Sequence, residues 1–209
     1  MTDACKQPGI RAQFRCPHGW LGWLVGHLMA LKNRERSEWV LSLLNVHPED
    51  HVLEIGFGSG VDIRRVAQRA RQGYVAGIDH SAEMLRQATA RNREAILEGR
   101  VDLRLGSAVR LPYGDASFDK VYAINVAQFF DDRASVFREY RRVLRPGGRL
   151  VIAVQPRSKA ATEASATQVG ENLHAAATAA GFADVRIERR PMRPVSTVCV
   201  LGSKPHLVD

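Results

Sequence analysis

A turn rich in glycine follows a short apolar segment near residue 55. That segment, Val52–Ile55, is typical of a buried strand and carries one acid, Glu54. Glycine then occupies every second position, at Gly56, Gly58 and Gly60. Glycine tolerates positive φ and has no Cβ, so such a turn lets a ligand contact the backbone. The helical pattern that follows would present free N–H groups to an acidic group. Together these features predict a site for a nucleotide-like ligand.

A second acid stands where a ribose would be bound. Tyr74–His80 is typical of a strand, and Asp79 lies near its end, about 20 residues past the glycine turn. An ionised carboxylate has two acceptor oxygens and can bind both hydroxyls of a ribose. Ser81 is suited to cap the next helix, and Glu83 suits the positive end of that helix.

The glycine spacing distinguishes between two kinds of ligand. A dinucleotide fingerprint reads G-x-G-x-x-G, but Val61 stands where its third glycine belongs. A nicotinamide dehydrogenase is therefore disfavoured. The stretch from Glu54 to Gly60 instead resembles motif I, E/D-x-G-x-G-x-G, of the class I S-adenosylmethionine (SAM)-dependent methyltransferases. The segments Phe118–Val121 and Leu144–Gly148 resemble the family's F-D-x-V and L-x-P-G-G signatures.

The resemblance implies a cofactor site for SAM, with S-adenosylhomocysteine (SAH) as product. In that family the glycine loop wraps the amino-acid part of SAM, the motif I acid contacts its ammonium end, and the motif II acid binds the ribose. By resemblance these acids are Glu54 and Asp79. The full set of expected cofactor-binding residues is Glu54, Gly56, Phe57, Gly58, Gly60, Asp79, His80, Met84, Ser107, Ala108 and Asn125.

One position departs from the family pattern. Relatives often carry Gly-Asp-Ala before a Leu-Pro dipeptide, with the Asp accepting from the adenine amino group, but this chain reads Gly106-Ser107-Ala108. Ser107 can accept one hydrogen bond and carries no charge. The backbone N–H of Ala108 remains available to the adenine ring.

Substrate-facing residues are expected at the carboxyl ends of the strands and in the N-terminal segment, because ligands of open α/β sheets bind beyond those ends. The candidates are His18, Trp20, His27, Gln128, Phe129, Gln155 and Arg157. His18 and His27 are the candidate general bases, although methyl transfer needs a base only for an acceptor with a high pKa. The sequence assigns no catalytic residue and no metal ligand set.

The composition narrows the class of protein and its partners. The chain has 209 residues, a net charge of +8 and 45% hydrophobic residues, as in an ordinary globular domain. Its arginines are dispersed without interleaved aromatics, which favours solvated helix faces over nucleic-acid binding. The three cysteines form no C-x-x-C pair, and a reducing cytoplasm is expected. No signal peptide is visible, and the apolar run at 20–31 is too short for a membrane span.

Alternating strand and helix patterns predict seven strands in an α/β fold. The resemblance implies a Rossmann-like three-layer α/β/α sandwich with a mostly parallel sheet, order 3-2-1-4-5-7-6, and strand seven antiparallel. Residues 1–47 are expected to form an N-terminal helical extension that acts as a lid, with one apolar helical pattern at residues 21–28 and a second at residues 39–44. Residues 48–209 are expected to form the SAM-binding domain. A polar stretch at 159–168 is expected to be a loop, and Pro146-Gly147-Gly148 to end the preceding helix.

The best-supported function is SAM-dependent methyl transfer to a small, partly apolar molecule. From its length, no added recognition domain is expected, and Asn125-Val126-Ala127-Gln128 stands where some nucleic-acid methyltransferases carry D/N-P-P-Y/F after strand four. A nucleic-acid or protein methyltransferase and a non-catalytic SAM-binding protein are the alternatives. The oligomeric state stays open, with a homodimer as one alternative.

Overall fold

The computed structural model describes residues 34–158 and 160–206. Its strands are β1 (His51–Ile55), β2 (Tyr74–Asp79), β3 (Val101–Leu105), β4 (Phe118–Ile124), β5 (Leu144–Val154), β6 (Ala183–Arg190) and β7 (Thr197–Ser203). Its helices are α3 (Arg34–Leu44), α4 (Val61–Arg69), α5 (Ala82–Arg91), α6 (Arg93–Leu97), α7 (Arg133–Val143) and α8 (Glu163–Ala179), with a short 3-10 helix, η2 (Ala127–Phe129).

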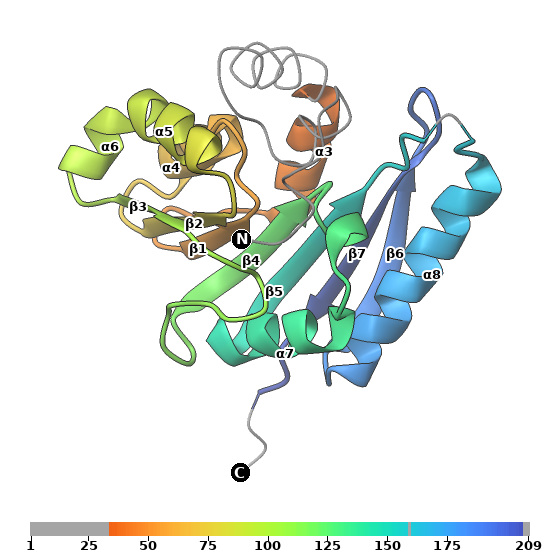
Figure 1. Ribbon diagram of the computed structural model, residues 1–209. Helices are drawn as coiled ribbons and strands as arrows, with labels where there is room; N and C mark the ends of the chain where they lie inside the picture. The colour runs from red at the N-terminus through yellow and green to blue at the C-terminus, as the bar shows by residue number, and fades with distance from the viewer. Residues whose placement is uncertain (1–33, 159, 207–209) are drawn as a thin grey trace.

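The strands form one sheet in the order β3-β2-β1-β4-β5-β7-β6. Neighbouring strands from β3 to β5 in this order are parallel, whereas β7 is antiparallel to both β5 and β6. Figure 1 shows α3, α4 and α5 on one side of the sheet and α7 and α8 on the other. The predicted three-layer fold, strand order and strand direction are therefore confirmed.

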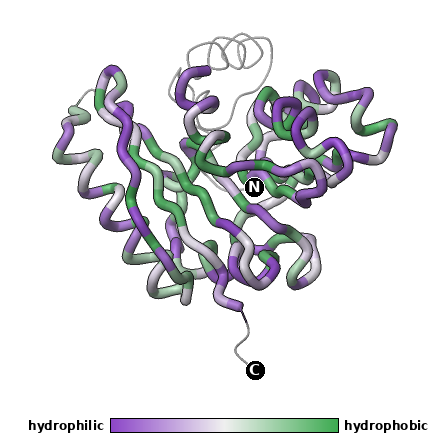
Figure 2. The backbone as a smooth tube through the Cα atoms, turned by 180° about the vertical axis from the view of Figure 1, so that it is seen from behind, coloured by the Kyte–Doolittle hydropathy of each residue, from purple (hydrophilic) through white to green (hydrophobic). Residues whose placement is uncertain are grey.

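The strands are held between two apolar cores because their side chains alternate in direction. In β5, Leu150, Ile152 and Val154 pack in the core under α7 and α8, while Val151 and Ala153 pack under α3, α4 and α5. A strand buried on both faces reads as a continuous apolar run, as expected for a parallel sheet covered by helices. Figure 2 shows the result, with hydrophobic colour along the central strands and hydrophilic colour along much of the outer helices and of the edge strand β6.

Two local expectations were wrong. The stretch 159–168 is not a loop throughout, because α8 begins at Glu163. Its start is fixed by a capping box in which Thr162 and Ser165 each accept a backbone N–H of the other, so two otherwise unpaired donors are satisfied. Polar, small residues can therefore start a helix when the spacing of the caps is right.

The second difference concerns the turn before strand five. Helix α7 ends at Val143, and β5 already begins at Leu144, so Pro146-Gly147-Gly148 lies within the strand. The backbone of this segment is paired with the chain after β7: Gly147 N donates to Lys204 O at 2.7 Å, and Lys204 N donates to Gly148 O at 2.9 Å. Gly147 has φ +77°, which explains why glycine stands there.

The second helical pattern of the predicted N-terminal extension is confirmed by α3. Val40, Leu41 and Leu44 are fully buried, and α3 packs against β4 and β5. The first pattern, near residues 21–28, lies outside the described residues. The boundary between an extension at 1–47 and a domain at 48–209 stays a prediction. Within residues 34–158 and 160–206, no helix is long and apolar enough to cross a membrane.

Candidate functional site

The predicted cofactor residues gather at one edge of the sheet. Strands β1, β2 and β4 are parallel neighbours, so their carboxyl ends lie together. The glycine turn leaves β1 at this edge, Asp79 ends β2, and Asn125 directly follows β4. The edge therefore brings together residues that are far apart in the sequence.

All three glycines of the turn have positive φ, namely +74° for Gly56, +52° for Gly58 and +74° for Gly60. A Cβ on Gly56 would lie 2.3 Å from Val126 Cγ2, and one on Gly60 would lie 2.6 Å from Ala88 Cβ. Packing thus requires glycine at both ends of the turn. A Cβ on Gly58 meets nothing within 4 Å among the described residues. The middle of the turn is therefore half-buried backbone with open space beside it that a ligand can enter.

Asp79 is fixed against this turn. Its Oδ2 accepts a hydrogen bond from Gly58 N at 2.9 Å, and its Oδ1 accepts one from Ser81 N at 2.9 Å. The side chain is only 6% exposed, and burial raises the pKa of its carboxyl despite these hydrogen bonds. Each oxygen keeps a further lone pair, so the carboxylate can still accept from a diol.

Glu54 is buried beneath the turn. Its Oε2 accepts a hydrogen bond of 2.7 Å from the hydroxyl of Tyr122 on β4, and its side chain is 3% exposed. Burial, and after it the negative charge of Asp62, raise the pKa of Glu54 well above its usual value of 4.5. A cation bound beside this buried acid would stabilise its ionised form and lower its pKa.

Asn125 connects the ends of two strands. It has φ +56°, its N–H donates to Ala153 O at 2.8 Å, and its Oδ1 accepts from Gln155 N at 2.8 Å. Gln155 is 3% exposed, and its amide donates to the carbonyls of Arg193 and Val195. The predicted substrate role of Gln155 therefore competes with an existing role in holding the loop before β7.

The remaining cofactor candidates differ in exposure. Phe57 and Met84 are buried in the core under α3, α4 and α5, whereas the His80 side chain is 56% exposed. Ser107 is exposed and accepts a hydrogen bond from Val109 N, and Ala108 is half-buried. Phe57 and Met84 therefore have buried, apolar side chains, whereas Ser107 and His80 offer polar side chains to a ligand.

The substrate candidates are only partly described. Gln128 and Phe129 are exposed in or beside η2, and Arg157 donates to Gln155 Oε1 at 3.4 Å. These residues follow β4 and β5, on the same edge as the glycine turn. His18, Trp20 and His27 lie outside the described residues, so their predicted roles stay predictions.

Two supporting residues escaped the sequence reasoning. Tyr122 is the hydrogen-bond donor to Glu54, and Asn92 donates to the carbonyls of Gly60 at 3.0 Å and Ala88 at 2.8 Å. A signal existed for the first, because a tyrosine within an apolar strand needs a partner for its hydroxyl, and Glu54 lies in another such strand. Asn92, at the end of a polar helix, carried no such signal.

The fold and the site together define the class of protein. A seven-stranded sheet of this order, a glycine turn after β1 and acids on β1 and β2 are the arrangement expected of a methyltransferase. Residues 53–152 match the family described as "Methyltransferase domain". The uncharacterised methyltransferase YdaC of Bacillus subtilis is 30% identical over 182 residues, covering 87% of this chain and 98% of that protein. The chain belongs to the class I SAM-dependent methyltransferase family.

Two further relatives show how widely the likeness extends. The 27-O-demethylrifamycin SV methyltransferase of Amycolatopsis mediterranei is 38% identical over 137 residues, and the match covers 65% of this chain and 50% of that protein. The solved structure of Haemonchus contortus phosphoethanolamine N-methyltransferase 2 with S-adenosyl-L-methionine has a TM-score of 0.68 and 18% identity. It covers 82% of this chain and 53% of that one, and the likeness is one of fold.

Proposed function

We propose that this protein transfers a methyl group from SAM to a small, partly apolar molecule. The observation that carries the proposal is the joint placement of Gly58 and Asp79: an open glycine backbone hydrogen-bonded to a buried acid. This pair fits a ligand that has both an amino-acid part and a ribose. SAM would supply an electrophilic methyl group when bound.

The residues fit the cofactor in three ways. The open space at Gly58 leaves room for a ligand against the backbone. Asp79 would accept from the ribose hydroxyls, since its oxygens are already oriented by two backbone N–H groups. Glu54, whose pKa burial raises well above its usual value, would gain an ionic partner from the ammonium end of the cofactor.

The protein's own contribution would be alignment and exclusion of water. Methyl transfer is faster when the acceptor is held in line with the donor. In well-oriented reactions, such alignment lowers the activation barrier by up to about 7–11 kcal/mol. Asn125 is held rigidly between the ends of β4 and β5 and would help to place the acceptor. The exposed ring of Phe129 and the alkyl part of Arg157 offer apolar surface on the same edge.

The substrate class is supported by relatives rather than by geometry. The Amycolatopsis relative is named as a methyltransferase of a rifamycin, and a relative from Aspergillus sclerotiorum is named as an O-methyltransferase. Both matches cover only half or less of those proteins, so they support the substrate class and not a particular acceptor atom.

The test is turnover with methyl-labelled SAM and a panel of acceptors. The panel should contain phenols, hydroquinones, amines, transfer RNA and a mixed protein extract. Label transfer to a small acceptor, lost in Asp79→Ala, is the expected result. Transfer only to RNA or to protein would overturn the substrate class, and SAH binding without transfer to any acceptor would favour a non-catalytic SAM-binding protein.

A further inference from the structure

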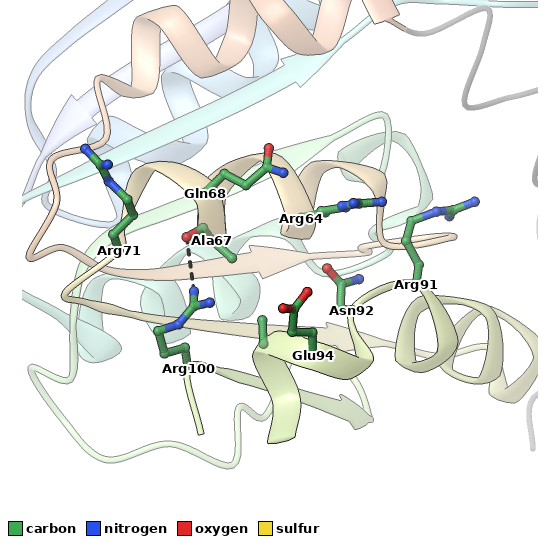
Figure 3. Close-up of a pocket in the computed structure, with 9 residues that line it drawn as sticks. Arg64, Ala67, Gln68, Arg71, Arg91, Asn92, Glu94 and Arg100 are labelled. Carbon is green, nitrogen blue, oxygen red and sulfur yellow. Dashed lines mark hydrogen bonds between the residues drawn. The ribbon is translucent and has the colours of Figure 1, made fainter. Parts of the chain in front are cut away.

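Four arginines that are scattered in the sequence line one cavity on the outer surface. The cavity has a volume of about 330 Å³ and lies between α4 and the α5–α6 segment. Arg64, Arg71, Arg91 and Arg100 line it together with a single acid, Glu94. Figure 3 shows Arg100 and Glu94 pointing toward α4, with Arg64 on that helix and with Arg71 and Arg91 directed outward at the two ends of the space. Arg64 and Arg71 are exposed, as expected of solvated arginines, whereas Arg91 and Arg100 are half-buried.

The positive charge of this cavity is only partly balanced. Arg100 pairs with Glu98 and donates to Ala67 O, and Arg91 donates to Ser59 O. Within the part of the chain that the structure describes, Arg64 and Arg71 pair with no acid. Burial, and after it the nearby charge of Arg64, lower the pKa of Arg91. Like charges held close together in a partly buried place are stabilised by a bound anion.

We propose that this cavity binds a small anion that carries several phosphate groups. The planar fork of arginine matches phosphate oxygens in pairs, and its charge does not titrate away. Four arginines against Glu94 and Glu98, which pairs with Arg100, leave an excess of positive charge that suits a multiply charged anion better than a single carboxylate. The volume lies at the lower end of small-ligand sites, about 300–1,000 Å³.

The lining argues against recognition of a nucleobase. None of the lining residues is aromatic, and proteins that bind single-stranded nucleic acid stack bases on aromatic side chains. The phosphate groups themselves are therefore what the cavity would recognise. This site is separate from the proposed methyl-transfer function, and either can fail without the other.

Two lining residues also hold the glycine turn. Arg91 donates to the carbonyl of Ser59, and Asn92 donates to that of Gly60. Changing them would disturb the proposed cofactor site as well as the cavity. Among the described residues, the side chains of Arg64 and Arg71 make no hydrogen bond to the turn, so they are the positions to test.

The experiment is calorimetric titration with tripolyphosphate at near-physiological ionic strength, about 0.15 M. The variant is Arg64→Gln/Arg71→Gln, and the control is Arg138→Gln/Arg186→Gln, which removes the same charge from exposed residues of α7 and β6. We expect binding to weaken by about tenfold or more in the variant and to stay within about twofold in the control. SAH binding, measured on the same preparations, should be equal in all three proteins.

A second variant changes the charge of the cavity in the opposite direction. Glu94→Gln removes the one acid of the cavity, so tripolyphosphate should bind about two- to fivefold more tightly, because a repulsion is lost. Absence of tripolyphosphate binding to the wild-type protein, or equal weakening in variant and control, would overturn the proposal. Tighter binding of an RNA duplex than of tripolyphosphate, lost in the same variant, would overturn the assignment to a small anion.

Discussion

Asp79 and Gly58 are joined by a hydrogen bond of 2.9 Å from Gly58 N to Asp79 Oδ2. The acid at the end of β2 and the middle of the glycine turn after β1 are therefore one rigid unit. The contact fixes where the carboxylate points, and it leaves the turn open where a Cβ on Gly58 would stand. A ligand bound against the turn must also meet the acid.

The openness at Gly58 can be tested with a matched control. Gly58 has φ +52° and Gly99 has φ +72°, and a Cβ at either position meets nothing within 4 Å among the described residues. Gly58→Ala and Gly99→Ala should thus share the cost of a left-handed alanine, about 1–2 kcal/mol. Only Gly58→Ala should weaken SAH binding in calorimetry. Equal SAH affinity for the two variants would mean that the ligand does not contact the turn.

Glu54 should make stability depend on pH. Burial raises its folded-state pKa above the usual 4.5, so above about pH 4.5 the folded protein keeps a proton that the unfolded chain has released. Its contribution to the free energy of unfolding is therefore present at low pH and falls as pH rises toward the folded-state pKa. Glu54→Gln removes this fall, and comparison with the wild-type protein cancels the similar effect of Asp79.

Urea unfolding of both proteins between about pH 5 and about pH 8 measures this difference. Glu54→Gln should gain stability relative to the wild type as the pH rises, and it should bind SAH more weakly because the ammonium end loses its anion. A stability difference that does not change with pH would contradict the raised pKa of the buried Glu54.

Removal of the Tyr122 hydroxyl should lower the free energy of unfolding, whereas removal of the Tyr140 hydroxyl should not. Both tyrosines are fully buried, but Tyr122 donates to Glu54, whereas the Tyr140 hydroxyl has no hydrogen-bond partner in the described part of the chain. Tyr122→Phe should lower the free energy of unfolding by about 1–3 kcal/mol, because it leaves a buried carboxyl oxygen unsatisfied. Tyr140→Phe should be neutral or stabilising. Urea denaturation at constant pH compares them, and an equal loss in both would show that the Glu54 contact contributes nothing.

Much of the fold followed from local patterns. The glycine turn, Asp79 at a strand end and the Ser81 cap were predicted because each rests on residues close in sequence, and the Ser81 side chain does accept from Met84 N at 3.3 Å. The strand order came from the family resemblance. The start of α8 was missed because the capping box of Thr162 and Ser165 outweighed a polar composition.

The contacts that complete the site depend on pairs distant in sequence. Tyr122 and Glu54 are 68 positions apart, and Asn125 reaches Gln155 across 30. The four arginines of the outer cavity come together only because α4 packs beside α5. Residue types along the chain cannot reveal such neighbours, since the sheet register and the helix packing decide them.

The most direct test of the account is calorimetric titration of the wild-type protein and Asp79→Ala with SAH, with NADH as a reference ligand. The account predicts that SAH binds the wild-type protein, that NADH does not, and that Asp79→Ala weakens SAH by about 1–3 kcal/mol through lost hydrogen bonds to a charged group. Thermal unfolding of the variant provides the check on folding. SAH binding that is unchanged in a folded Asp79→Ala protein, or NADH binding in place of SAH, would contradict the proposed cofactor site.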